Sequence, residues 1–180
     1  MAKNNLKIQN IVATSSLNVK VPLVKLVRSQ PNTEYNPEQF PGLVLRIKKP
    51  KSAVLVFSSG NIVCTGTKST KQVEEVIVQV IRQLKKIGVK VKDKPKINVQ
   101  NIVASGSINV VMNLNKLALK LENTEYEPEQ FPGLVYKIEE PNATFLLFSN
   151  GNLVCTGTKN RKQLDEVMKK VLKNTREAMK

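Results

Sequence analysis

The residue types that usually carry out covalent or acid–base chemistry are scarce in this chain of 180 residues. It has no histidine, and its two cysteines, Cys64 and Cys155, stand alone rather than in CxxC pairs, so a zinc site is not expected. Carboxylates recur in two loops, at Glu34, Glu38, Glu125 and Glu129. These loops have no converging pair of base and nucleophile, which a catalytic site would need. The sequence therefore predicts a protein that is not an enzyme and that uses no cofactor or metal.

Four phenylalanines have a spacing that indicates a binding role instead. Phe40 and Phe57 are 17 residues apart, and Phe131 and Phe148 repeat that spacing. A phenylalanine at the end of a strand usually belongs to a core, but two identical pairs argue for a shared function. Phe145 does not fit the pattern, and we expect it in the core.

The elements that must position these residues are present twice. Asn32–Gln72 contains EYNPEQFPGLV and FSSGNIVCTGTK, and Asn123–Gln163 contains EYEPEQFPGLV and FSNGNLVCTGTK. QNIVA also occurs near the start of each half, and the offset between the copies is 91 residues throughout. Two copies with so long a period are typical of a duplicated and fused fold rather than of a solenoid. We predict two tandem repeats, residues 1–92 and 93–180, without a flexible linker.

Hydrophobic periodicity and turn residues predict the same elements in each repeat. In the first repeat, strands are expected at Lys7–Val21, Leu43–Lys48, Ser52–Phe57, Asn61–Gly66 and Val89–Asp93. A short helix is expected at Leu23–Ser29, with Pro22 in its first turn, and a long helix at Thr70–Ile87. Ser69 and Gln72 resemble a capping box for the long helix, which has one apolar stripe.

The strands are apolar on both faces. Side-chain alternation places one set on one face, namely Asn10, Val12, Leu55, Phe57, Val63 and Thr65. The opposite face receives Ile11, Val54, Val56, Ile62 and Cys64. One long and one short helix per repeat can cover a single face, and three consecutive strands exclude a doubly wound parallel sheet. We predict an α+β fold with an antiparallel sheet whose uncovered apolar face is a binding site.

The charge of the chain favours a polyanionic partner. Its 29 Lys and Arg residues against 14 Asp and Glu give a formal charge of +15, which favours nucleic acid first and an acidic membrane second. No apolar run is long enough to span a bilayer. An apolar face and positive charge are both explained if the ligand is duplex DNA bound through its minor groove. Apolar side chains would pack on the groove floor, asparagines would donate to base acceptors, phenylalanines would wedge between base steps, and cations would hold phosphates.

The paired motifs QNIVA, EYxPEQFPGLV and FSxGNxVCTGTK resemble those of the TATA-binding proteins, the general transcription initiation factors, over nearly the whole chain. The resemblance implies a pseudo-two-fold saddle, in which two tandem repeats form one curved antiparallel sheet of about ten strands with helices on the convex face. It implies a protein that binds the TATA box, bends the DNA and nucleates the preinitiation complex. Because the repeats begin close to Met1, the archaeal type is expected.

The resemblance also implies which residues contact DNA. The wedge pairs are Phe40 with Phe57 and Phe131 with Phe148. Base hydrogen bonds come from Asn10, Asn101, Thr65 and Thr156, and the apolar floor from Val12, Leu55, Val63, Val103, Leu146 and Val154. Phosphates are held by Arg46, Lys68, Lys137 and Lys159, with Ser59 as a lesser contact. Asn61 and Asn152 stand where relatives often carry lysine, and Asn150 where they carry serine.

Partners are implied as well. A factor resembling transcription factor IIB would dock on the second repeat through Glu127 and Glu129, and RNA polymerase would join through the preinitiation complex. The first-repeat counterparts are Asn36 and Glu38, and this charge difference could help to orient the polymerase. Without DNA, the protein could form a homodimer through its concave face. No membrane partner is expected, and the location would be the archaeal cytoplasm at the nucleoid, or the nucleus in a eukaryote.

Two alternatives stay open at this point. The lysine-rich surface could serve only to keep the protein in solution, and the apolar face could belong to a scaffold that binds a peptide or a second copy. The salt dependence of DNA affinity distinguishes DNA binding from a peptide-binding face, since phosphate contacts weaken steeply with salt whereas a peptide-binding face barely responds.

Overall fold

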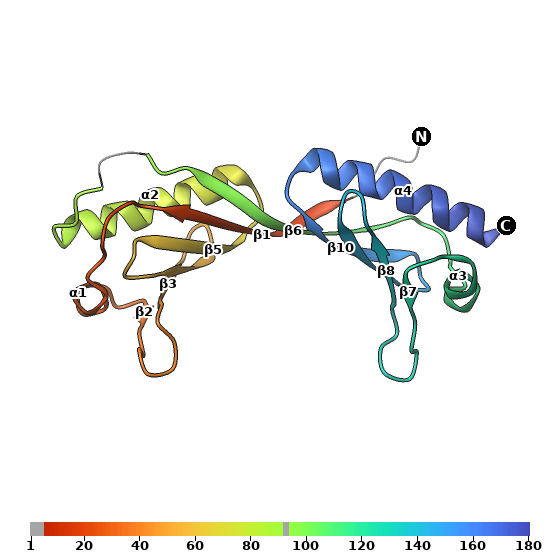
Figure 1. Cartoon of the computed structure of the whole chain (residues 1–180), viewed down its shortest axis with the longest axis horizontal. Helices are drawn as coiled ribbons and strands as arrows, with labels where there is room; N and C mark the ends of the chain where they lie inside the picture. Colours follow the sequence, from red (N-terminus) through yellow and green to blue (C-terminus); the bar gives the residue numbers. More distant parts are fainter. Residues whose placement is uncertain (1–5, 92–93) are drawn as a thin grey trace. The chain divides into compact units, whose positions relative to one another are not determined.

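The computed structural model describes residues 6–91 and 94–180 (Figure 1). The first half contains β1 (Lys7–Ser16), α1 (Leu23–Ser29), β2 (Thr33–Glu34), β3 (Leu43–Ile47), β4 (Ser52–Val56), β5 (Asn61–Thr67) and α2 (Thr70–Lys86). The second half contains β6 (Ile97–Ser107), α3 (Leu114–Lys120), β7 (Thr124–Glu125), β8 (Leu134–Ile138), β9 (Ala143–Leu147), β10 (Asn152–Thr158) and α4 (Arg161–Met179). The element order is the same in both halves, as the duplicated sequence predicts.

The ten strands have the order β2-β3-β4-β5-β1-β6-β10-β9-β8-β7, and the pairings within each half are antiparallel. The predicted α+β class with two tandem repeats is confirmed. The chain forms two compact units: the first unit is Asn10–Gln100, and the second unit combines Asn101–Lys180 with the start of β1, up to Gln9. The predicted repeat boundary between residues 92 and 93 lies outside the described residues and stays a prediction.

In each unit, the long helix covers one face of the strands. Figure 1 shows α2 on one side of the strands of the first unit. Val54 and Ile62 of the sheet and Val73 and Val76 of α2 are at most 1% exposed, and burial of such a side chain contributes about 1.5–3 kcal/mol to stability. In the second unit α4 covers the equivalent face, where Phe145 is completely buried. The prediction that Phe145 belongs to the core is confirmed.

The long helices begin at matching side-chain caps. Ser69 Oγ accepts a hydrogen bond from the backbone N–H of Gln72 at 3.2 Å, as the predicted capping box requires. The Gln72 side chain accepts from the backbone N–H of Lys68 at 2.8 Å rather than from that of Ser69. In the second unit Asn160 and Gln163 make the equivalent cap. The caps fix where the last long strand of each unit passes into its helix.

The strand predicted at Val89–Asp93 is wrong for Val89–Val91, and residues 92 and 93 lie outside the described residues. The backbone N–H of Val89 donates to Leu84 O at 3.0 Å and that of Gly88 donates to Lys85 O at 3.0 Å. With Gly88 at φ 87°, this is a Schellman motif that ends α2. The amide of Val89 therefore caps a helix and is not available to a sheet.

Each half still has five strands, because it contains a two-residue strand, β2 or β7, that the sequence did not predict. β2 pairs with β3, with Thr33 opposite Leu45, and β7 pairs with β8, with Thr124 opposite Tyr136. Two residues are too few for alternation to reveal a strand, because a period of two needs several residues to be recognised.

The first strand is also shorter than predicted. β1 ends at Ser16 rather than Val21, because Asn18 adopts a left-handed conformation with φ 50° and turns the chain. The backbone N–H of Val21 then donates to Ser58 O at 3.0 Å. Pro22 lies at the N-cap of α1 rather than in its first turn. The other predicted boundaries in the first half agree with the structure to within one residue.

Candidate nucleic-acid interface

Each unit leaves one face of its strands without a helix, and we call it the open face. In the first unit it contains Asn10, Val12, Leu55, Phe57, Val63 and Thr65, all of which are partly exposed. Their neighbours on the same strands, such as Ile11, Val56 and Cys64, are at most 1% exposed. In the second unit the equivalent residues Asn101, Val103, Leu146, Phe148, Val154 and Thr156 are also partly exposed. The burial pattern agrees with the predicted alternation.

Two phenylalanine rings form a pair at the end of the open face in the first unit. Phe40 lies in the loop between β2 and β3 and is 41% exposed, whereas Phe57 directly follows β4. Their ring centroids are 5.9 Å apart and their planes meet at 66°, an edge-to-face contact. The loop turns at Asn36, whose carbonyl accepts from the backbone N–H of Phe40 at 2.9 Å.

A glycine makes room for this ring pair. A Cβ atom on Gly42 would lie 2.7 Å from Phe40 Cε1 and 3.0 Å from Phe57 Cε1. Any other residue at this position would displace the rings. Glycine is therefore required at position 42 because the two rings lie so close to its Cα atom, and not because of its backbone conformation.

The second unit has the same ring pair. Phe131 is 40% exposed, and its centroid lies 6.0 Å from that of Phe148 with an interplanar angle of 67°. A Cβ atom on Gly133 would lie 2.6 Å from Phe131 Cε1 and 3.1 Å from Phe148 Cε1. Both units thus present two large apolar rings, one of them well exposed.

A bulge in β5 sets the orientation of Asn10. Between the pairs Ile11–Thr67 and Ala13–Cys64, β5 has one residue more than β1, and Gly66 has φ 98°. The backbone N–H of Gly66 donates to Asn10 Oδ1 at 2.7 Å.

The amide group of Asn10 is therefore assigned without ambiguity. A backbone N–H can only donate, so the oxygen of the amide must face Gly66. Asn10 Nδ2 donates one hydrogen to Thr65 Oγ1 at 3.0 Å. Its second hydrogen has no acceptor among the described residues, so the site offers a donor to a ligand on the open face.

Asn101 is held in the same way in the second unit. Its Oδ1 accepts from the backbone N–H of Gly157 at 2.7 Å, and its Nδ2 donates to Thr156 Oγ1 at 3.0 Å. Gly157 has φ 104°. The structure thus brings each predicted asparagine next to its predicted threonine.

Cross-strand neighbours build the apolar floor. Leu55 lies opposite Val63 on one side and opposite Val44 on the other. In the second unit, Leu146 lies between Val154 and Val135 in the same way. These rows give each open face a continuous apolar strip.

Sequence reasoning missed four residues of these rows. Val44 and Val135 are partly exposed and continue the floor towards β3 and β8. Thr14 lies opposite Val63, and Ser105 lies opposite Val154. Alternation would have identified all four, because Thr14 and Ser105 are two residues from the predicted floor residues Val12 and Val103, and Val44 and Val135 are two residues from the predicted phosphate contacts Arg46 and Lys137.

The predicted phosphate-binding residues are in different environments. Arg46 Nε donates to Glu34 Oε1 at 3.1 Å, and both side chains are more than 60% exposed. Lys137, the counterpart of Arg46, forms no ion pair with a described residue. Lys68 and Lys159 are exposed and directly follow β5 and β10. Arg46 is thus partly neutralised, whereas the three lysines form no ion pair within the described part of the chain.

The turns beside the phenylalanines differ in one residue type. Ser59 Oγ accepts from the backbone N–H of Asn61 at 3.3 Å. Asn150 Oδ1 accepts from the backbone N–H of Asn152 at 3.0 Å. Asn150 therefore replaces a serine without loss of the turn.

The open faces are hollowed next to the rings. A hollow of about 620 Å³ lies beside Phe57 and is also lined by Val63 and Asn98. A hollow of about 770 Å³ lies beside Phe148 and is also lined by Lys7. Lys7 and Asn98 are repeat equivalents, so the second hollow has a cation that the first lacks.

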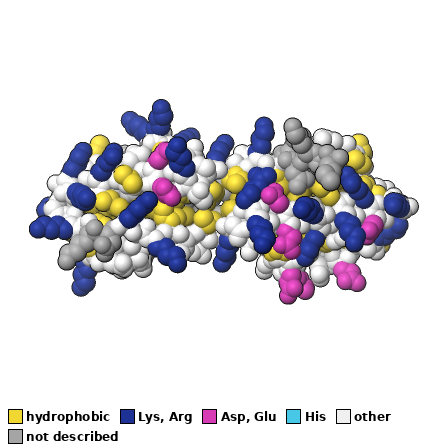
Figure 2. Space-filling view, turned by 90° about the horizontal axis from the view of Figure 1, so that it is seen from above, with side chains coloured by type: hydrophobic (Ala, Val, Ile, Leu, Met, Phe, Trp, Pro, Cys, Tyr) yellow, Lys and Arg dark blue, Asp and Glu magenta, His cyan; other side chains and the backbone are white. Residues whose placement is uncertain are grey.

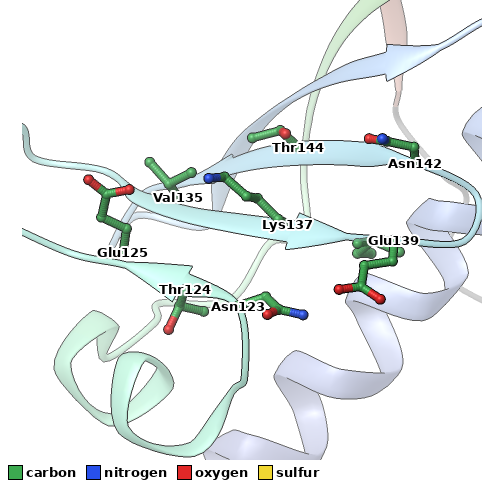
Figure 3. Close-up of a pocket in the computed structure, with 9 residues that line it drawn as sticks. Asn123, Thr124, Glu125, Val135, Lys137, Glu139, Asn142 and Thr144 are labelled. Atoms are coloured by element: carbon green, nitrogen blue, oxygen red, sulfur yellow. The ribbon is translucent and has the colours of Figure 1, made fainter.

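A third hollow, of about 350 Å³, lies on the second unit between β7, β8 and β9 (Figure 3). Val135, Lys137 and Thr144 of the two longer strands line it, with Glu125 and Glu139. Figure 3 shows that it combines one cation with two carboxylates. Its lining, with Lys137 against Glu125 and Glu139, has a net charge of −1.

The residues predicted to bind a protein partner are exposed. Glu127 and Glu129 lie in the loop before Phe131, where Glu127 O accepts from the backbone N–H of Phe131 at 2.9 Å. Both residues therefore belong to the loop that positions Phe131. The first unit has Asn36 and Glu38 at these places.

Positive charge is not limited to the open faces. Figure 2, which looks onto the side where the helices lie, shows Lys and Arg side chains spread over both units. Part of the net charge is therefore ordinary solvated surface.

The cysteines take no part in the interface. Burial raises the pKa of the Cys64 thiol to about 11 and that of the Cys155 thiol to about 12, and both side chains are at most 1% exposed. Both are therefore neutral and shielded at pH 7. Within the part of the chain that is described, no group of histidine, cysteine and carboxylate side chains could hold a metal ion, and no helix is long and apolar enough to cross a membrane.

Comparison with known proteins gives concordant matches. The family model for "Transcription factor TFIID (or TATA-binding protein, TBP)" matches residues 5–87 and 96–178. The TATA-box-binding protein of Sulfolobus acidocaldarius is 48% identical over 164 residues, which cover 91% of this chain and 83% of that protein. The TATA-box-binding protein of Pyrococcus furiosus is 46% identical over 173 residues, which cover 96% of this chain and 91% of that protein.

A solved structure agrees with the sequence matches. The fold of Methanococcus jannaschii TBP superposes with a TM-score of 0.92 and 42% sequence identity, covering 96% of this chain and 99% of that one. The relatives named here are archaeal.

Proposed function

The chain belongs to the TATA-binding protein family, and from this premise we propose that its open faces bind the minor groove of a TATA element and bend the DNA. Membership makes the chain a DNA-binding general transcription factor of archaeal type rather than an enzyme. The groove, the bending and the partner proteins are the proposed part.

The orientation of the two asparagine side chains is the observation that supports minor-groove binding most strongly. Asn10 and Asn101 each present an N–H that has no acceptor among the described residues, beside the apolar rows of the open face. The minor groove of A·T pairs offers only acceptors, adenine N3 and thymine O2, whereas guanine adds a donor, its N2 amino group. A donor flanked by an apolar floor therefore favours A·T pairs and disfavours G·C pairs.

The ring pairs support bending. Phe40 and Phe131 are exposed, and their partners Phe57 and Phe148 hold them at the ends of the apolar rows. For minor-groove proteins of this family, unstacking a base step costs on the order of a few kcal/mol, which the wider contact with bent DNA offsets. We infer that each pair wedges open one base step.

Cations at the rim would hold the phosphates. Lys68, Lys159, Lys137 and Arg46 would make contacts that fix the position of the DNA without reading its sequence, with Ser59 as a lesser contact. These contacts give the affinity a steep dependence on salt.

A footprint tests the DNA proposal. The protein is expected to protect a TATA duplex and to leave a duplex unprotected in which the A·T pairs of the element are replaced by G·C. Equal protection of both duplexes, with a steep salt dependence, would reduce the function to non-specific DNA binding.

Protein partners belong to the same proposal. A factor resembling transcription factor IIB would dock at Glu127 and Glu129, and RNA polymerase would join through it, in the cytoplasm of an archaeal cell. Glu129→Arg is expected to leave TATA binding unchanged but to weaken the ternary complex in a gel shift, with Glu38→Arg in the first unit as the matched control. An unchanged supershift for Glu129→Arg would remove this assignment.

Self-association through the open face is a further proposal for the protein without DNA. An apolar face of this extent can bind a second copy. Sedimentation analysis with and without a TATA duplex is expected to show a dimer that DNA dissociates, and a monomer at all concentrations would contradict it.

A further inference from the structure

The two units differ most in charge at one corner of each open face. This corner is formed by the turn between β3 and β4 in the first unit and by the turn between β8 and β9 in the second. The first turn contains Lys48, Lys49 and Lys51. The second has Glu139, Glu140 and Asn142 at the equivalent places.

The backbone frame of the two turns is the same. The ladder of the first ends at the pair Ile47–Ser52, and that of the second at Ile138–Ala143. The long helix holds each turn: Gln79 Nε2 donates to Lys49 O at 2.9 Å, and the Lys170 ammonium donates to Glu140 O. The charge difference therefore lies on an equivalent scaffold.

Two residues of the second turn border the open face. In the second unit, Glu139 and Asn142 line the same hollow as Val135 and Thr144 of the strands (Figure 3). Because the two turns have equivalent ladder ends and anchors, we infer that Lys48 and Lys51 border the open face of the first unit in the same way, beyond Arg46.

The net charge of the two corners has opposite sign. The first corner consists of Arg46, Lys48 and Lys51 with Glu34, three cations against one carboxylate, for a net charge of +2. The second consists of Lys137, Glu125, Glu139 and Asn142, one cation against two carboxylates, for a net charge of −1. In the first corner Glu34 is already paired with Arg46. Lys48 and Lys51 are exposed and form no ion pair with a described residue.

We propose that Lys48 and Lys51 form an additional phosphate-binding corner in the first unit that the second unit lacks. The inference rests on the proposed function, in which DNA lies on the open face. Phosphates line both rims of the groove, so cations just beyond the apolar floor are placed to meet them. The carboxylates of the second corner repel phosphate instead. DNA contact therefore extends farther along the first unit than along the second, and the footprint is asymmetric about the element.

Exchange of the turn residues tests this. In the 180-residue chain, K48E/K51N gives the first corner the turn residues of the second, and E139K/N142K does the reverse. K85E/K86N changes the charge by the same amount on exposed residues of α2 and is the matched control. Affinity for a TATA duplex is measured from 50 to 200 mM salt by anisotropy, together with a hydroxyl-radical footprint.

Each phosphate contact contributes about 0.9 to the slope of log affinity against log salt. K48E/K51N is therefore expected to lower that slope by about 2, which makes the affinity loss over this salt range roughly tenfold smaller, and to shorten protection on one flank. E139K/N142K is expected to raise the slope and to lengthen protection on the other flank, and the control is expected to change neither. K48Q/K51Q, which adds no acidic group, should also lower the slope by about 2, and it replaces K48E/K51N if circular dichroism shows that variant to be unfolded.

The outcomes separate this inference from the proposed function. If the wild type protects the TATA element but K48E/K51N leaves slope and flank unchanged, the lysines do not bind phosphate, and an acidic protein is the better partner for them. That result overturns the inference and leaves the proposed function intact. If the wild type gives no protection of the TATA duplex, the proposed function itself fails.

Discussion

The two units place the same side chains in nearly the same geometry, but on surfaces of different charge. The ring centroids are 5.9 Å apart in one pair and 6.0 Å in the other, and both asparagine oxygens accept from a glycine N–H at 2.7 Å. In contrast, Arg46 is paired with Glu34 whereas Lys137 is not paired with Glu125. The corner turn of the first unit contains three lysines, and the equivalent positions of the second contain two glutamates and an asparagine. The groups proposed to contact the groove floor are duplicated, whereas the groups at the rim are duplicated only in part: Lys68 and Lys159 correspond, but the charges around Arg46 and Lys137 differ. This difference is expected if base contacts need fixed geometry, whereas charges act over several ångströms.

Asn10→Asp and Asn101→Asp are expected to have the largest effect on binding, and the two should be similar. The carboxylate keeps an acceptor for the glycine N–H but replaces a donor by an anion that faces the acceptors of the groove. We expect a loss of about 3 kcal/mol in TATA affinity for each, roughly 100-fold, measured by anisotropy.

Asn115→Asp, on an exposed position of α3, is the control for the added charge. A large loss for only one of the two asparagine variants would show that the units do not bind equivalently.

Phe57→Ala and Phe148→Ala should come next, because each removes half of a ring pair. Loss of an aromatic surface that stacks on a base costs about 1–3 kcal/mol. Bending, measured by energy transfer between the ends of a labelled duplex, should fall more than non-specific affinity. Equal loss of bending and of non-specific binding would count against the wedge.

Phe145→Ala is the matched contrast, because this ring is buried on the helix side. It should lower the free energy of unfolding by about 3–5 kcal/mol. Its effect on DNA binding should follow only from lost stability.

Gly42→Ala and Gly133→Ala should weaken TATA binding and bending as Phe57→Ala and Phe148→Ala do, but by less. The added Cβ would approach the exposed ring within 2.7 Å in one unit and 2.6 Å in the other. The ring can swing away, so we expect a loss of about 1 kcal/mol or slightly more in TATA affinity, with reduced bending. Thermal unfolding should change little, and a marked drop in stability would mean that the glycines serve the fold rather than the ring pair.

Substitution of the two cysteines by alanine should have the smallest effect, with no effect on DNA binding at pH 7. Burial raises the thiol pKa from an ordinary 9.0 to about 11 for Cys64 and about 12 for Cys155. The thiol pKa is higher in the folded state than in the unfolded state. The contribution of the buried thiols to the free energy of unfolding is therefore complete below pH 9 and is lost as the pH rises towards 11 or 12.

The difference in unfolding free energy between the wild type and Cys64→Ala or Cys155→Ala should therefore shrink above pH 9. The thiols should also resist modification at pH 8 in the native protein. Fast labelling at pH 8 without denaturant would contradict the burial of these groups.

Much of the fold could be predicted from the sequence, because the duplicated pattern defines each element twice. Alternation along β4 and β5 separated Val54 and Ile62 from Leu55 and Val63, and the stripe on α2 showed what covers the first two. The two-residue strands β2 and β7 could not be found, since they are too short for periodicity. Val89 looked like part of a strand because its role in capping α2 is a backbone property that its side chain does not reveal.

The site was predicted less completely. The positions of Asn10 and Thr65 on one face followed from alternation, but their hydrogen bond depends on the bulge at Gly66. A bulge changes the register between two strands that are distant in sequence, so local patterns do not contain it. The ion pair of Arg46 with Glu34 likewise depends on the pairing of β2 with β3.

The central claim, that the open faces read base acceptors in the minor groove, is tested most directly with inosine. An I·C pair has the major-groove edge of G·C but lacks the guanine N2 amino group, so its minor groove resembles that of A·T. TATA affinity and bending should be retained when the A·T pairs of the element are replaced by I·C and lost when they are replaced by G·C. Loss of both on the I·C duplex would contradict the account, because the protein would then be reading the major groove.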